Sequence, residues 1–242
     1  MGTDVFAATD FYGSARGEMA ARLLGERLAA IWAPGDPGRR SNLSFLGVGY
    51  AAPYLDMWRP GAARCVAVTP SGPFGPGRLP PGGIKSCCAA SEDALPFPDL
   101  SFDRILLVHG LEVADNARGL LRELWRVLKD DGRLLVVVPN RVSVWAQLES
   151  TPFGQGQPYS AGQIGRVLAG SMFRVERRDT ALHVPPVNAR LVLRGARYWE
   201  KFGRRFIPSL PGVTISEAVK ECYAAIPMRR VARRRLVLAK AA

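Results

Sequence analysis

The sequence has few of the residues from which metal sites and disulfide frameworks are built, and it has no long apolar run. Among 242 residues there are 4 Cys and 2 His. The cysteines show no CxxC spacing, so we expect reduced, packed thiols rather than a metal site or disulfides. They are Cys65, Cys87, Cys88 and Cys222. No apolar stretch approaches the roughly 18 residues that a membrane span needs, and the start MGTDVFAATD lacks the pattern of a secretory signal. We expect a cytoplasmic protein without a membrane span.

Positive charge is concentrated in one part of the chain. The formal net charge is +12. Residues 1–140 hold 15 Lys and Arg against 15 Asp and Glu, whereas residues 141–242 hold 18 against 6. Such a basic block predicts attraction to nucleic acid, an anionic membrane surface or an acidic protein, and it is also compatible with a solvated face that has no partner.

One segment of the basic part predicts a helix over residues 188–206. Its cations recur at steps of three or four and so share one face, and they are Arg190, Arg194, Arg197, Lys201 and Arg204. Its large apolar residues fall mainly elsewhere and are expected to pack in the core; these are Leu191, Trp199, Phe202 and Phe206. We expect the basic face to bind an acidic protein surface. Nucleic acid is a poorer candidate, because no recognition motif is present.

Strand patterns alternate with helix patterns over most of the chain. An amphipathic helix is predicted over residues 16–32, and a second over residues 115–132 with Asp115 as its cap. Continuous apolar runs, typical of strands covered on both faces, span residues 43–48, 64–68, 84–88, 104–109 and 133–138. This order predicts a doubly wound α/β fold.

After Asn140 the chain changes character. A loop rich in Pro, Gly and Gln precedes a predicted short helix over 163–168, a strand pattern over 172–182 and a clear strand over 236–239. We expect one domain over residues 1–242, with an N-terminal helical region 1–42, a core 43–180, and a basic helical insertion and final strand over 181–242.

Three stretches in this order resemble one family: LGVGYAAPYL, SEDALPFPDLSFDRILLVHGLE and LLRELWRVLKDDGRLLVVVPN. Together they look like the type 11 branch of the class I S-adenosylmethionine-dependent methyltransferases, over roughly residues 43 to 180. The resemblance implies a mostly parallel, seven-stranded, Rossmann-like sheet with an antiparallel last strand. It also implies transfer of a methyl group to an unidentified acceptor, with a small molecule as one candidate.

The resemblance implies that S-adenosylmethionine binds across the carboxyl ends of the first strands. The cofactor contacts that it predicts come from Gly47, Gly49, Tyr50, Ala51, Thr69, Ser91, Glu92, Asp93 and His109. Gly47 and Gly49 let backbone N–H groups approach the methionine part of the ligand, and Pro53 fits the first turn of the following helix. These glycines could also serve only a tight turn.

The carboxylates that family members use in this site are replaced or displaced here. Phe45 stands where the strand before the glycines carries an acid, and Thr69 stands where an acid grips the ribose hydroxyls. Ser91 occupies the place of the acid that meets the adenine amine, with Glu92 and Asp93 beside it. A loop over residues 69–83 with five prolines could place Phe74 against the adenine, block the pocket or do neither. We therefore expect weakened cofactor binding.

His109 is the one candidate catalytic residue. It ends a predicted strand at the point where substrates meet cofactors in open α/β sheets, and Glu112 follows three residues later. It could deprotonate an acceptor, or merely shape the pocket. Asp103 begins the same strand and is predicted to be structural. A second hypothesis for the whole chain is a degenerate methyltransferase fold that acts as a binding or regulatory module for an acidic partner.

Overall fold

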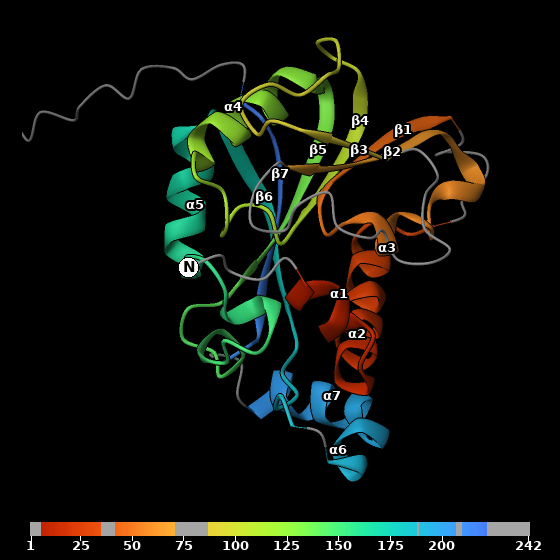
Figure 1. Ribbon diagram of the computed structural model, residues 1–242. Coiled ribbons are helices and arrows are strands. Elements are labelled where there is room, and N and C mark those ends of the chain that lie inside the picture. The colour runs from red at the N-terminus through yellow and green to blue at the C-terminus, as the bar shows by residue number, and fades with distance from the viewer. Residues whose placement is uncertain (1–5, 35–41, 71–86, 188, 207–209, 222–242) are drawn as a thin grey trace, which may run out of the picture.

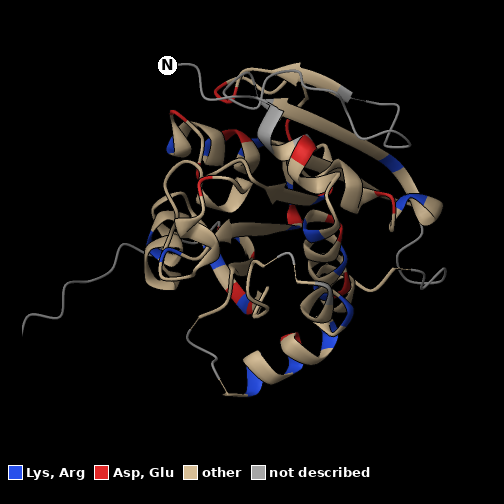
Figure 2. Cartoon of the chain, turned by 60° about the horizontal axis from the view of Figure 1, so that its bottom comes forward, with Lys and Arg blue, Asp and Glu red and all other residues tan. Residues whose placement is uncertain are grey.

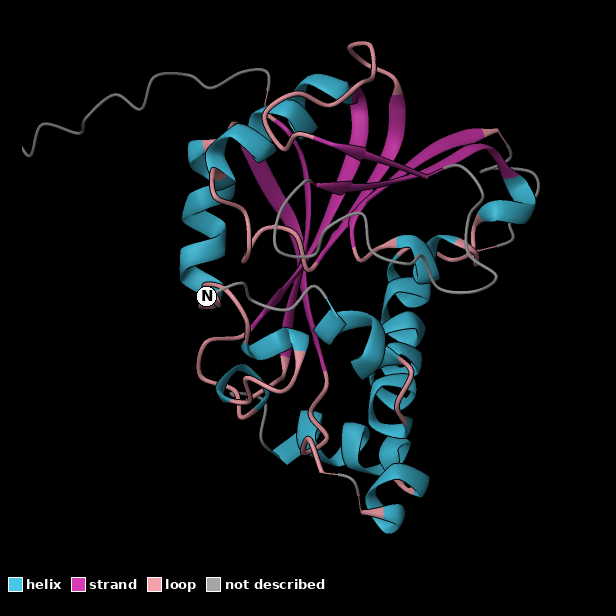
Figure 3. Cartoon of the chain, in the orientation of Figure 1, coloured by secondary structure: helices cyan, strands magenta, loops and turns pink. Residues whose placement is uncertain are grey.

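A computed structural model describes residues 6–34, 42–70, 87–187, 189–206 and 210–221, with a twisted sheet at its centre (Figures 1 and 3). The strands lie in the order β3-β2-β1-β4-β5-β7-β6. Their bounds are β1 Leu43–Gly49, β2 Ala62–Pro70, β3 Cys87–Ala90, β4 Phe102–Val108, β5 Leu128–Pro139, β6 Phe173–Ala181 and β7 Val213–Lys220. Neighbours from β3 to β5 pair in parallel, and β7 is antiparallel to both β5 and β6. The predicted fold is confirmed.

Helices cover both faces of the sheet (Figure 1). They are α1 Phe6–Tyr12, α2 Ala15–Ile31, α3 Ala52–Leu55, α4 Ala117–Val127, α5 Ala161–Gly170, α6 Arg190–Arg194 and α7 Ala196–Phe206. Side-chain caps begin the longer ones: Ser14 accepts from Gly17 N before α2, and Ser160 forms a capping box with Gln163 before α5. Asn116, rather than the predicted Asp115, caps α4.

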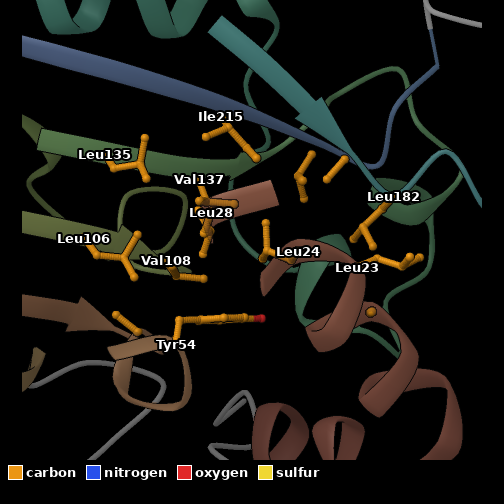
Figure 4. Close-up of a cluster of buried hydrophobic side chains, with 14 of the residues drawn as sticks. Leu23, Leu24, Leu28, Tyr54, Leu106, Val108, Leu135, Val137, Leu182 and Ile215 are labelled. Carbon is orange, nitrogen blue, oxygen red and sulfur yellow. The ribbon is translucent and has the colours of Figure 1, made fainter. Parts of the chain in front are cut away.

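Successive residues of the central strands feed two separate cores. Leu106 and Val108 of β4 point to the side of α1, α2 and α3, and Figure 4 shows them with Leu24 and Leu28. The alternate residues of the same strand pack with α4 and α5 on the other face. Both faces are therefore buried, which is why the strands read as unbroken apolar runs.

The expected antiparallel last strand is present as β7, but its place in the chain, Val213–Lys220, was not predicted from the sequence. Its segment VTISEAVK contains polar residues at buried positions. Glu217 is one of them, and it accepts from Trp32 Nε1 at 2.8 Å and pairs with Arg133 at 3.3 Å. Long-range partners thus satisfy a charge that a local pattern reads as exposed.

Other predictions have different outcomes. The helix predicted over 188–206 is two helices, α6 and α7, which separate at Gly195. The proline-rich segment 71–86 with Phe74, the strand predicted over 236–239 and Cys222 lie outside the described residues. Cys65 and Cys88 are free thiols, and burial raises the pKa of Cys65 to about 11. Within the described part of the chain, no helix is both long and apolar enough to cross a membrane.

Asp103 joins three segments of the chain at the start of β4. Its Oδ2 accepts from the backbone N–H of Ser44 at 2.9 Å, and its Oδ1 accepts from Lys129 Nζ at 2.8 Å. The carboxylate is largely buried and makes no contact with the carboxyl ends of the strands, as expected for a structural residue.

Substituting Asp103 by alanine should lower the free energy of unfolding by about 1–3 kcal/mol, because the Ser44 N–H loses its acceptor inside the protein. Urea denaturation measures the change. Asp103→Asn is the matched control: it keeps one acceptor oxygen and should lose less. A variant that stayed as stable as the wild type but no longer bound S-adenosylmethionine would contradict this role.

Candidate functional site

The carboxyl ends of β1, β2 and β4 lie level at one edge of the sheet. Gly49 pairs with Val108 of β4, and Val48 pairs with Val68 of β2. Thr69 therefore lies level with Gly49. The loops that follow these strands start beside one another, so residues from distant parts of the sequence can share one site.

The glycine turn after β1 is a point of close contact within the protein. Gly49 has φ +74°, and a Cβ there would lie 2.2 Å from the carbonyl oxygen of Val108. A Cβ on Gly47 would lie 2.6 Å from Leu55 Cδ1 and 2.9 Å from the Cβ of Ala51. Both positions require glycine for internal reasons. A role in holding a ligand would be additional.

The helix after this turn is a single turn long. α3 has four residues, and Ala51 precedes it without a side-chain cap, while Pro53 lies in its first turn as expected. A helix this short carries a small dipole. Upstream in β1, the Phe45 ring stacks on that of Trp58 with ring centroids 5.6 Å apart, so this side chain packs in the core.

A chain of hydrogen bonds runs through the loop after β4. His109 Nδ1 lies 2.9 Å from Glu112 Oε1, and His109 Nε2 lies 2.8 Å from the hydroxyl of Tyr12. A carboxylate only accepts hydrogen bonds, so Nδ1 is suited to donate to Glu112, and in the tautomer with its proton on Nδ1, Nε2 accepts from Tyr12. His109 and Glu112 are 2% and 3% exposed. The chain is therefore shielded from water.

Aromatic rings enclose this chain. The ring of Tyr12 stacks on that of Tyr50, with centroids 4.5 Å apart and planes 10° apart, and Phe153 lies edge-on to His109 at 4.8 Å. Burial raises the pKa of Tyr12 well above its ordinary value and that of Tyr50 to about 12. Both phenols therefore stay protonated at neutral pH.

Glu112 is the acidic side chain of this cluster. Its second oxygen, Oε2, is buried and has no hydrogen-bond partner among the described residues. A buried carboxylate oxygen without a partner costs free energy unless a donor or a cation meets it. The loop thus holds a buried acceptor oxygen that a positively charged or hydrogen-bond-donating group would stabilise.

The acids predicted for the adenine end make contacts within the protein. Glu92 Oε1 accepts from the backbone N–H of Asn116 at 2.6 Å, and Asp93 Oδ1 accepts from Asn116 Nδ2 at 3.0 Å. Both carboxylates are thereby tied to the start of α4. Ser91 is exposed, and its carbonyl oxygen accepts from the N–H of Ala94. Thr69 remains partly exposed at the end of β2.

The structure thus brings Gly49, Tyr50 and His109 together and adds Tyr12, which the sequence reasoning did not identify. Tyr12 lies 97 positions from His109, and no spacing links them. Its pairing depends on how α1 folds back over the sheet edge (Figure 1). Sequence alone offers no signal for such a contact.

Comparison with known proteins finds relatives for part of the chain. Residues 46–136 match the family model described as a methyltransferase domain. An uncharacterized protein of Mycobacterium tuberculosis is 31% identical over 122 residues, which cover 48% of this chain and 43% of that protein. The demethylmenaquinone methyltransferase of the same species is 35% identical over 106 residues, which cover 40% of this chain and 45% of that protein. The chain thus matches less than half the length of these curated relatives.

Solved structures share the fold at low sequence identity. A putative methyltransferase of Haloferax volcanii, solved in complex with the Trm112 methyltransferase activator, has a TM-score of 0.58 and 15% identity, and the match covers 88% of this chain and 96% of that one. An S-adenosylmethionine-dependent methyltransferase of Thermotoga maritima, described as a possible histamine N-methyltransferase, has a TM-score of 0.53 and 16% identity, covering 81% and 88%. The fold is that of these methyltransferases.

The raised pKa of Tyr50 has a consequence for stability in alkali. Between about pH 10 and about pH 12 the unfolded chain has released this proton while the folded chain retains it. The folded state then binds more protons, so the free energy of unfolding falls as pH rises. Tyr50→Phe should make this fall shallower in urea denaturation followed across that range. Tyr198→Phe, at a tyrosine 84% exposed, is the control and should keep the wild-type slope. Equal slopes for all three proteins would contradict the raised pKa of Tyr50.

Proposed function

We propose that this chain, which contains a methyltransferase domain over residues 46–136, transfers a methyl group from S-adenosylmethionine to an acceptor at the carboxyl edge of β1 and β4. The observation that carries the proposal is the buried hydrogen-bonded chain from Tyr12 through His109 to Glu112, which adjoins the turn at Gly49 and Tyr50. The methyltransferase domain implies the use of this cofactor.

The described residues fit the sulfonium end of the cofactor better than its adenosine end. The unpartnered oxygen of Glu112 would face a positively charged sulfur favourably, and the stacked faces of Tyr12 and Tyr50 attract cations. At the ribose end, Thr69 offers one neutral hydroxyl where a carboxylate would accept two hydrogen bonds. This contrast supports weak cofactor binding.

The residues of the site would act mainly by positioning. The cofactor supplies a methyl group that is already activated by the positive sulfur, so aligning the acceptor provides much of the rate. The Tyr12 oxygen can accept a hydrogen bond from an acceptor hydroxyl or amine while its own proton is directed at His109 Nε2. As the acceptor loses its proton, His109 takes the proton through Tyr12, and Glu112 stabilises the resulting imidazolium.

An acidic protein partner for the basic part of the chain stays a prediction. The sequence reasoning assumed that the aromatic residues of the 188–206 segment are buried, and in α7 they are exposed. Exposed aromatic rings beside the cations of α7 favour an anionic surface that also accepts apolar groups.

Thr69→Asp should tighten S-adenosylmethionine binding on the order of tenfold, because a carboxylate replaces a neutral hydroxyl opposite the ribose. Isothermal titration calorimetry of the wild type and the variant measures both dissociation constants. Thr69→Asn is the matched control: asparagine has the shape of aspartate without its charge, so this variant should gain little affinity. Gly49→Val would not test cofactor contact, because the valine side chain would collide with the Val108 carbonyl oxygen and disturb the sheet itself. If neither the wild type nor Thr69→Asp gave heat, the binding-module hypothesis would replace the enzyme.

Glu112→Gln should weaken binding of S-adenosylmethionine by about tenfold and leave binding of S-adenosylhomocysteine unchanged. The two ligands differ in the sulfonium charge, and the glutamine oxygen can still accept from His109 Nδ1. The ratio of the two dissociation constants, from the same titrations, isolates the charge. Loss of affinity for both ligands alike would mean that Glu112 only shapes the site.

A further inference from the structure

The helix α7 presents its large aromatic residues to solvent. Trp199, Phe202 and Phe206 are 44%, 51% and 66% exposed, and Tyr198 is 84% exposed. The rings of Trp199 and Phe202 lie 6.4 Å apart and those of Phe202 and Phe206 lie 4.5 Å apart, so they form a continuous strip. The prediction that these residues pack in the core is wrong.

Contacts on the opposite side of α7 explain this orientation. Its buried residues are Ala196, Glu200 and Gly203. Glu200 Oε2 accepts from the backbone N–H of His183 at 2.7 Å, and a Cβ on Gly203 would lie 2.6 Å from His183 Cβ. Only the side with small residues can approach the protein this closely. The aromatic side must therefore face outward.

A third strip on α7 is basic. Arg197, Lys201 and Arg205 follow one another at steps of four, and the one acid of the helix, Glu200, lies on the buried side. Arg197 pairs with Glu26 of α2. Within the described part of the chain, Lys201 and Arg205 have no ion pair. The outward surface of α7 thus carries aromatic rings and positive charge, and no negative charge.

The basic strip borders a hollow between α2 and α7. Lys201 and Arg205 line it together with three other arginines, each of which pairs with an acid: Arg27 with Asp179, Arg197 with Glu26 and Arg204 with Glu200. Figure 2 brings this end of the molecule forward with Lys and Arg in blue, and Figure 1 places α6 and α7 at the end opposite α4. Aromatic rings and a group of cations therefore lie side by side on one end of the molecule.

We propose that this end of the protein binds the surface of an anionic lipid bilayer through α7. A helix with an aromatic strip beside a Lys- and Arg-rich strip is suited to lie in the plane of the bilayer surface, with its rings at the headgroup level and its cations on lipid phosphates. Lysine and arginine without fixed carboxylate partners bind phosphates in any register, which a fluid surface provides. The carboxylates of an acidic protein could pair with the cations, but they would not account for the exposed aromatic strip of Trp199, Phe202 and Phe206.

Sedimentation of the full chain with vesicles tests the binding. Vesicles of phosphatidylcholine and phosphatidylglycerol should bind the protein, and phosphatidylcholine alone should not. Lys201→Glu with Arg205→Glu should lower the affinity about 20-fold or more, because each cation near an anionic surface contributes roughly fivefold. Arg118→Glu with Arg122→Glu is the matched control: both residues are exposed, four apart on α4 and at the other end of the molecule. This pair should retain most of the affinity, and circular dichroism checks that both variants fold.

Tryptophan fluorescence tests the orientation. Anionic vesicles should shift the emission to shorter wavelength, because the exposed Trp199 enters the headgroup region, and Trp199→Phe should lose the shift while keeping most of the binding. The assay contains no cofactor, so its result is independent of methyl transfer.

Several outcomes would overturn the proposal. They are no binding to anionic vesicles, equal loss of binding in the α7 and α4 charge variants, and an emission shift that persists in Trp199→Phe. Binding to poly-glutamate without binding to vesicles would replace the bilayer by an acidic protein. A dimer in analytical ultracentrifugation that Phe202→Ser dissolves would replace it by a second copy of the chain.

Discussion

The close approach of β1 to β4 at Gly49 is the constraint on which the candidate site depends. A side chain at this position would collide with the Val108 carbonyl oxygen, and the next N–H, that of Tyr50, donates to the same oxygen at 2.7 Å. This contact fixes the exit of β1 against the exit of β4. It thereby sets Tyr50 and His109 at a fixed separation, into which the ring of Tyr12 fits.

The site on this frame is apolar in its walls and charged at one point. Phe153 and the two tyrosines exclude water from His109 and Glu112. A carboxylate in such surroundings has a high desolvation cost, which the hydrogen bond from His109 offsets only in part because one oxygen is left over. A protein retains such a group at a cost in stability unless a donor or a cation meets it.

The sequence predicted the parts of the fold that follow from local patterns. Unbroken apolar runs identified the parallel strands, and the spacing of Leu23, Leu24 and Leu28 identified α2. Two kinds of feature were not predicted from the sequence. The strand β7 places Glu217 in the interior, where Trp32 and Arg133 satisfy it, and a single sequence does not display such distant partners.

The second kind concerns which side of an element faces inward. Trp199 and Phe202 were predicted to be buried because they are hydrophobic. In α7 the opposite side faces inward, because Gly203 and Glu200 on that side make close contacts with His183. Likewise, the pairing of Tyr12 with His109 joins residues 97 positions apart and depends on the path of α1. In the site itself, the sequence identified Gly49, Tyr50 and His109, which lie together.

The Tyr12 hydroxyl of the site is carried by a short helix, α1. α1 has seven residues and joins α2 through a sharp corner at Ser14, and Phe11 anchors it against Trp145 and Phe153. Fraying of α1 would release Tyr12 from His109 without breaking any strand pairing or the cap of α2. Access to His109 would then depend on the local opening of one short helix rather than on global unfolding. Exchange of ligands at the sheet edge can therefore proceed while the sheet stays intact.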